Sequence, residues 1–149
     1  MVSITPKSEI FSIFKNLNYK AWFALAEYVD NSLQSHIDWG KDYKAQEGRP
    51  QTLEVDINIH DDDDDGGKRI TITDNARGIA LADFERAFQV AVRPRSSSTS
   101  LNEFGMGMKT ASFWFANQWS MTTQFFGESV SRMMVFNLDE ILEHKLSDI

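Results

Sequence analysis

Between residues 53 and 60 the chain alternates apolar and polar side chains without a break. The apolar positions of this run are Leu53, Val55, Ile57 and Ile59. Because successive side chains of a β-strand point to opposite faces of the sheet, a period of two predicts a strand with one buried face. Residues 68–73 form a second, shorter run of this kind. The two runs predict an antiparallel hairpin whose tip carries the aspartates at 61–65.

Helical periodicities precede this hairpin. Apolar residues recur every three or four positions over residues 8–17, where Ser8 is the expected cap, and again over residues 19–38. The spacing predicts a short helix followed by a longer amphipathic one. The stripe expected to face the core on the longer helix consists of Trp22, Leu25, Ala26, Val29, Leu33 and Ile37.

The same criteria predict the elements that follow the hairpin. They are a helix over 81–91 with Phe84, Ala87, Phe88 and Ala91 on its core face, a helix from Gly105 to residue 115, strands over 118–126 and 130–136, and a short helix over 139–145. This order of helices and hairpins is typical of an α+β fold, with helices covering one face of a mainly antiparallel sheet. A length of 149 residues suits one domain over residues 1–149.

Composition excludes several classes of function. The net charge is −7, and residues 61–65 account for five of the 22 acidic side chains. A nucleic-acid binder or a basic membrane-surface protein needs the opposite field, so direct nucleic-acid binding is not expected. Without cysteine, thiolate metal sites and cysteine nucleophiles are excluded. No apolar stretch approaches the roughly 20 residues that span a bilayer, and we expect an intracellular, cytoplasmic protein.

Three polar groups interrupt the core patterns, and such interruptions are where functional sites are expected. The first lies on the long helix, where Glu27 and Asn31 are four residues apart and share one face, with Asp30 beside them. A carboxylate and a carboxamide in this arrangement suit a general base and an oxygen ligand for Mg²⁺. The alternative for this group taken alone is a solvated helix face.

The second group follows the strand at 68–73. Asp74 comes at the end of that strand, with Gly78 and Ile79 shortly after it. A carboxylate in this place can face a pocket, and the glycine lets a ligand approach the backbone. The alternative is an Asx-type turn that only reverses the chain.

The third group is the pair Gly105 and Gly107, which opens a helix after the serine-rich stretch 93–100. Backbone amides at a helix N-terminus, not covered by side chains, form an anion site. Lys109, in the first turn of that helix, is placed either to reach a phosphate or to lie on the surface. The segment is not a Walker A loop, because neither of its two glycines is directly followed by lysine.

Together and in this order, the three groups resemble the GHKL ATPase superfamily. Its members include gyrase B subunits, the large ATP-dependent heat-shock chaperones, MutL mismatch-repair proteins and sensor histidine kinases. The resemblance covers roughly residues 20–136, and the stretch 102–109 is most similar to the microrchidia (MORC) and chaperone-like branch. It implies a Bergerat-type two-layer α+β sandwich that binds ATP and Mg²⁺.

The resemblance also implies a role for each group. Glu27 would activate the attacking water, and Asn31 would hold Mg²⁺ to the phosphates of ATP. Asp74 would accept a hydrogen bond from the adenine amino group, Gly78 would admit the base and Ile79 would pack on it. The phosphates would meet the segment that consists of Gly105, Met106, Gly107, Met108 and Lys109, and residues 93–100 would form a lid over the nucleotide.

The chain departs from the superfamily pattern in two places. Ala76 stands where a glycine is usual, two residues after Asp74. Nothing after Phe136 supplies the strand with a Gly-Thr pair whose threonine helps the aspartate to bind adenine. We therefore expect either an N-terminal piece of a longer protein that lacks its last strand or strands, or a short variant of the fold.

Three functions follow from this interpretation. The first is an ATPase switch, in which Mg·ATP binding favours self-association as a homodimer, or binding of a protein partner, and slow hydrolysis resets the domain. The second is a serine or histidine protein kinase of the same fold; histidine kinases usually carry asparagine at the position of Glu27, which favours hydrolysis here. The third is a nucleotide-binding interaction module without turnover.

Overall fold

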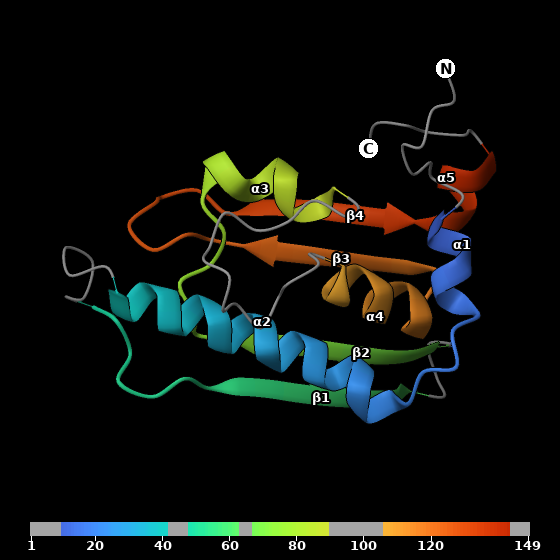
Figure 1. Ribbon diagram of the computed structural model, residues 1–149, viewed down its shortest axis with the longest axis horizontal. Coiled ribbons are helices and arrows are strands. Elements are labelled where there is room, and N and C mark those ends of the chain that lie inside the picture. Colours follow the sequence, from blue (N-terminus) through green and yellow to red (C-terminus); the bar gives the residue numbers. More distant parts are fainter. Residues whose placement is uncertain (1–9, 42–47, 63–66, 90–105, 144–149) are drawn as a thin grey trace, which may run out of the picture.

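A computed structural model describes residues 10–41, 48–62, 67–89 and 106–143 (Figure 1). In chain order the elements are α1 (Ile10–Lys15), α2 (Ala21–Lys41), β1 (Val55–Asp62), β2 (Gly67–Asp74), α3 (Leu81–Phe88), α4 (Gly107–Phe115), β3 (Gln118–Thr123), β4 (Arg132–Asn137) and α5 (Leu138–Glu143). The α+β class and the order of elements are as predicted. The expected lid at 93–100, Gly105 and the predicted helix ends at 90–91 and 144–145 lie outside the described residues.

Both predicted hairpins form, and both are antiparallel. β1 pairs with β2 so that Val55 lies opposite Asp74, and β3 pairs with β4 so that Gln118 lies opposite Asn137. The described strands make two separate two-stranded sheets. Figure 1 shows α2 and α4 on the same side of the two hairpins, which gives a layer of helices over a layer of strands.

An aromatic cluster forms the core beside the second hairpin. Its buried members are Phe11, Phe14, Phe88, Phe113, Phe136, Leu138 and Ile141. The Trp119 ring stacks on Phe136, with 4.3 Å between ring centroids, and Phe113 meets both rings edge-on. Phe84 and Ala87 pack against this cluster, as the periodicity of α3 predicted. The core therefore anchors α4 firmly at the centre of the molecule.

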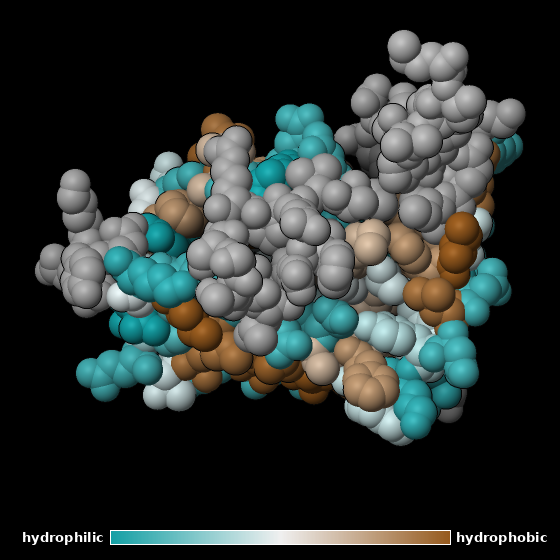
Figure 2. Space-filling model, viewed as in Figure 1, coloured by the Kyte–Doolittle hydropathy of each residue, from teal (hydrophilic) through white to brown (hydrophobic). Residues whose placement is uncertain are grey.

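The prediction for the buried face of α2 is wrong. Trp22 is 62% exposed, and Val29, Leu33 and Ile37 are between 37% and 40% exposed. Figure 2 shows apolar side chains gathered in a band where α2 crosses the lower part of the view. The buried side chains of α2 are instead Ala24, Ser32, His36 and Trp39.

Hydrogen bonding explains this orientation. Tyr28 meets the Ser112 hydroxyl of α4 at 2.8 Å, and Ser32 donates to Asp74 at the end of β2. Because buried polar groups are stable only with hydrogen-bond partners, the partners on α4 and β2 fix which side of the helix turns inward. A polar face that points into the molecule is an expected property of a functional helix.

β1 is also more exposed than its alternation predicts. Ile59 is 70% exposed and Ile57 is 36% exposed, so the outer half of the strand has no buried face. Among the described elements, β1 packs mainly against its hairpin partner β2. The alternation predicted the strand correctly, but period-two spacing does not tell whether a second layer covers it.

Candidate functional site

Helices α2 and α4 pack against each other and run in opposite directions (Figure 1), and the carboxylate of Glu27 lies beside Gly107, the first residue of α4. A methyl group built on Gly107 would lie 1.8 Å from Oε2 of Glu27 and 2.7 Å from its carboxyl carbon. No other residue type leaves room for the carboxylate in this position. A negative charge is also stabilised at a helix N-terminus, where the backbone amides carry partial positive charge.

The other oxygen of the same carboxylate has a side-chain partner. The Tyr19 hydroxyl donates to Oε1 of Glu27 at 2.9 Å. Partial burial, and secondly the hydrogen bond and the charge of Glu27, raise the pKa of Tyr19 to about 12. The hydroxyl therefore keeps its proton at neutral pH and acts as a donor. The sequence did not single out Tyr19, which precedes α2 and lies eight positions before its partner.

Asn31 lies one turn after Glu27 on the same helix, as its spacing predicted. Its amide nitrogen donates to the backbone carbonyl of Glu27 at 2.6 Å. Within the described ranges there is no group of three or more His, Cys, Asp or Glu side chains that could enclose a metal ion. A carboxamide oxygen is a hard ligand of the kind that Mg²⁺ accepts when phosphates supply much of its coordination. The residues present thus fit a metal held by Asn31 and a bound polyphosphate.

Asp74 is tied to the same helix. Its Oδ2 accepts a hydrogen bond from the Ser32 hydroxyl at 2.8 Å, and its Oδ1 accepts one from the Ala76 amide at 2.9 Å. The second contact is the Asx-type turn that the sequence left open as an alternative. The Asp74 side chain nevertheless stays exposed. The turn and an accessible carboxylate therefore coexist.

Ser32 is a contact that the sequence analysis missed. It is 5% exposed and follows Asn31 directly, on the inward side of α2. Through Ser32, the helix that carries Glu27 and Asn31 also holds the carboxylate of Asp74. The first two predicted groups are thus both in contact with α2. The third group meets the same helix where Gly107 lies against the carboxylate of Glu27.

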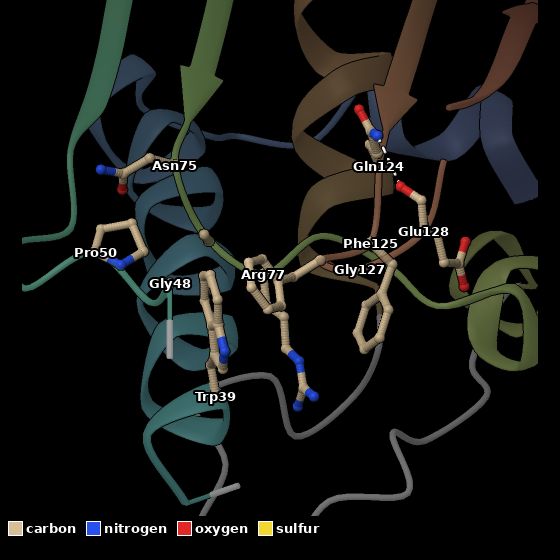
Figure 3. Close-up of a pocket in the computed structure, with 11 residues that line it drawn as sticks. Trp39, Gly48, Pro50, Asn75, Arg77, Gln124, Phe125, Gly127 and Glu128 are labelled. Carbon is tan, nitrogen blue, oxygen red and sulfur yellow. Dashed lines mark hydrogen bonds between the residues drawn. The ribbon is translucent and has the colours of Figure 1, made fainter. Parts of the chain in front are cut away.

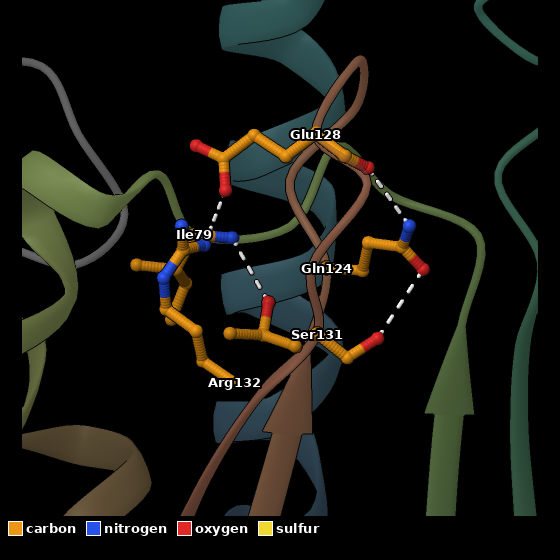
Figure 4. Close-up of polar contacts among 6 residues, drawn as sticks. Ile79, Gln124, Glu128, Ser131 and Arg132 are labelled. Atoms are coloured by element: carbon orange, nitrogen blue, oxygen red, sulfur yellow. Dashed lines mark hydrogen bonds and ion pairs between the residues drawn. The ribbon is translucent and has the colours of Figure 1, made fainter.

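Gly78 and Ile79 belong to the turn that follows Asp74. Gly78 has a φ of +77°, and a methyl group there would lie 2.2 Å from the backbone oxygen of Gln124. The Ile79 amide donates to the Thr123 hydroxyl at 3.0 Å. Figure 4 shows this contact beside the loop after β3, where Gln124 and Ser131 are hydrogen-bonded and Glu128 pairs with Arg132. The turn is therefore fastened to the end of β3.

The remaining predicted residues open α4. Met106 is the residue before the helix and its side chain caps no amide, while Met106 and Met108 pack against the aromatic core. Their side chains thus face away from a polar ligand, and only their backbone is suited to one.

Lys109 lies in the first turn, 3% exposed, and its amine donates to the carbonyl of Ala87 at 2.7 Å. In this structure it therefore joins α4 to α3. Burial, and secondly the nearby Arg86, lower the pKa of Lys109 to about 8.

A separate pocket of about 350 Å³ lies beyond the turn, between the C-terminal end of α2 and the loop after β3 (Figure 3). The Arg77 guanidinium carbon lies 4.7 Å from the centre of the Phe125 ring, and the Trp39 ring lies 4.8 Å from that of Phe126. None of the predicted site residues lines this pocket. Asn75 and Ala76, which follow Asp74 directly, do line it, so the pocket adjoins the turn after Asp74.

Comparison with known proteins decides the family. The model of the family described as "Histidine kinase-, DNA gyrase B-, and HSP90-like ATPase" matches residues 19–149. The chain belongs to this ATPase family. The match includes all the predicted site residues and confirms the resemblance at the level of the GHKL superfamily. A search of the curated proteins gave no match.

Membership of the ATPase family implies that this domain binds ATP. None of the helices in the described part of the chain is long and apolar enough to cross a membrane. The antiparallel hairpins and the overlying helices agree with the fold of the ATPase family.

Proposed function

We propose that the domain binds Mg·ATP between α2 and the start of α4 and hydrolyses it slowly, as a switch for self-association or partner binding inside the cell. The observation that carries the proposal is the carboxylate of Glu27, held against the N-terminus of α4 one turn from Asn31. A base, a metal ligand and an anion-binding helix end are the three parts that phosphoryl transfer to water requires.

Glu27 serves as the general base. Its carboxylate takes a proton from the attacking water, and the hydroxide character that develops is directed at the terminal phosphorus. Tyr19 and Gly107 limit where the carboxylate can lie, so the base is positioned before the nucleotide arrives. Because the base is already positioned, less entropy is lost when the reactants reach the transition state.

The start of α4 binds the phosphates. Backbone amides of Met106 and of the first turn donate to phosphate oxygens, and the helix dipole favours their negative charge. Asn31 would hold the metal ion through its carboxamide oxygen, and a bound Mg²⁺ would supply a positive charge that offsets the charge of the phosphates.

Asp74 selects the base of the nucleotide. Its exposed carboxylate accepts a hydrogen bond from the exocyclic amine of adenine, whereas guanine presents a carbonyl oxygen in the same place and is repelled. Ser32 holds the carboxylate by donating to Oδ2. Ile79, on the turn fastened to β3, packs against the ring.

Isothermal titration with ATP and GTP, each with and without Mg²⁺, tests the binding part. The proposal predicts saturable binding of Mg·ATP, much weaker binding of Mg·GTP, and weaker ATP binding once the metal is chelated. Release of phosphate then tests hydrolysis. Transfer of label from γ-labelled ATP to a protein would indicate the kinase alternative, and binding without either reaction would indicate an interaction module.

A further inference from the structure

We propose that Tyr19 is the positioning residue for Glu27. Gly107 contributes to the same positioning, because its lack of a side chain leaves room for the carboxylate. The inference rests on the proposed role of Glu27 as general base, and it assigns to Tyr19 no contact with the nucleotide. It follows from two contacts made by the opposite oxygens of one carboxylate.

A glutamate side chain has three rotatable bonds, so a carboxylate at the end of it samples many positions unless both of its oxygens are constrained. Here the Tyr19 hydroxyl fixes Oε1 at 2.9 Å. The backbone of Gly107 lies against Oε2, so closely that any side chain at that residue would occupy the same space. Together the two contacts place the carboxylate at the N-terminus of α4.

Tyr19 is itself held from two sides. Its ring meets Trp114 edge-on, with 6.0 Å between centroids, and its amide donates to the Leu17 carbonyl at 2.8 Å. The indole nitrogen of Trp114 donates to that same carbonyl at 3.2 Å. The segment between α1 and α2 is therefore fastened to the C-terminal part of α4, while Glu27 touches its N-terminal residue. The hydroxyl is placed by the same helix whose other end meets the base.

The chemistry of a phenol suits this task. A tyrosine hydroxyl is a neutral donor, so it orients the carboxylate without placing a full positive charge against it. A lysine or arginine in its place would stabilise the ionised carboxylate, and this would weaken the base that has to accept a proton. The direction of the contact also agrees with helix geometry, because side chains such as that of Glu27 lean toward the N-terminal end of their helix.

The variant Tyr19→Phe removes the hydroxyl and keeps the ring on Trp114. We expect kcat for ATP hydrolysis to fall about tenfold or more, with the Kd for Mg·ATP within about twofold of the wild-type value. Tyr28→Phe is the matched control, since it removes a hydroxyl whose 2.8 Å hydrogen bond joins α2 to Ser112 of α4 and does not involve the carboxylate of Glu27. It should leave kcat unchanged. An unchanged kcat in Tyr19→Phe, or an equal loss in both variants, would overturn the inference.

A second measurement needs no activity. Urea midpoints of Tyr19→Phe, Glu27→Ala and the double variant form a cycle in which a direct contact makes the double effect smaller than the sum of the single effects, because each single variant removes one partner of the hydrogen bond. Additive midpoints would overturn the contact. If the wild-type protein hydrolyses no ATP while the cycle shows coupling, the proposed function fails and the pairing of Tyr19 with Glu27 stands.

Discussion

Oε2 of Glu27 lies where a side chain of Gly107 would begin, only 1.8 Å from an ideal methyl position. The pair joins the middle of α2 to the first residue of α4. Glycine at residue 107 therefore leaves room for the carboxylate of the base and also leaves the helix N-terminus uncovered. The sequence placed both residues in one site, but for separate reasons. In the structure the carboxylate of Glu27 can lie at the start of α4 only because residue 107 has no side chain.

Gly107→Ala tests this relationship. We expect the free energy of unfolding to fall by no more than about 1 kcal/mol, because the added methyl group has to displace only the far end of a flexible side chain. Glu27→Ala in the same chain removes the colliding group, so the double variant should recover most of the loss in urea unfolding. A double variant as unstable as Gly107→Ala alone would contradict the collision.

Gly78→Ala should destabilise the domain through two effects. The φ of +77° costs about 1 kcal/mol or more for an alanine, and the collision with the Gln124 carbonyl adds to it. Gly127 has a φ of +86° with nothing within 4 Å of a methyl group, so Gly127→Ala carries the strain alone. The order of urea midpoints should be wild type, Gly127→Ala, then Gly78→Ala as the least stable. Equal midpoints for the two variants would mean that the turn after Asp74 is not pressed against the end of β3.

Lys109 predicts a pH dependence of stability. Its pKa in the folded chain is about 8, below the ordinary 10.5, so between these values the unfolded chain binds more protons and stability rises with pH. Lys109→Met lacks this group. The difference in unfolding free energy between wild type and Lys109→Met should shift in favour of the wild type from pH 8 to pH 10, by about 1–3 kcal/mol. A constant difference would contradict a buried amine at the junction of α3 and α4.

Ser32→Ala tests how Asp74 is held. The variant leaves Oδ2 of Asp74 without its side-chain donor on α2. We expect the affinity for Mg·ATP to fall by a few-fold in isothermal titration, with less effect than a change of Asp74 itself, since the Ala76 amide still holds Oδ1. Ser35→Ala, one turn along the same helix, is the control and should bind as the wild type does. A loss in Ser35→Ala of the same size would point to a general effect on α2.

The fold was largely readable from the sequence because hairpins and helices have distinct periods. The alternation over 53–60 and the paired runs after residue 117 predicted both hairpins, and the antiparallel registers follow from them. What period alone could not give was the orientation of α2. Its apolar stripe is the exposed side, because the polar side finds partners in Ser112 and Asp74 that lie 84 and 42 residues away.

The site shows the same division. Glu27 and Asn31 were predictable because one helical turn fixes their relation to each other. Tyr19, Ser32 and Thr123 were not, since each acts through a partner on another element and none breaks a local pattern. Lys109 illustrates the limit most clearly. Its position in the first turn allows a phosphate contact, but its amine reaches the carbonyl of Ala87, at the end of α3.

The central claim is that Glu27 and Asp74 serve one bound nucleotide in different ways, and the most direct measurement is a paired titration and phosphate-release assay on two variants. Glu27→Ala should bind Mg·ATP with nearly wild-type affinity and release no phosphate above background. Asp74→Asn should lose most of its affinity for ATP. Equal loss of binding in both variants, or hydrolysis that survives in Glu27→Ala, would contradict the account.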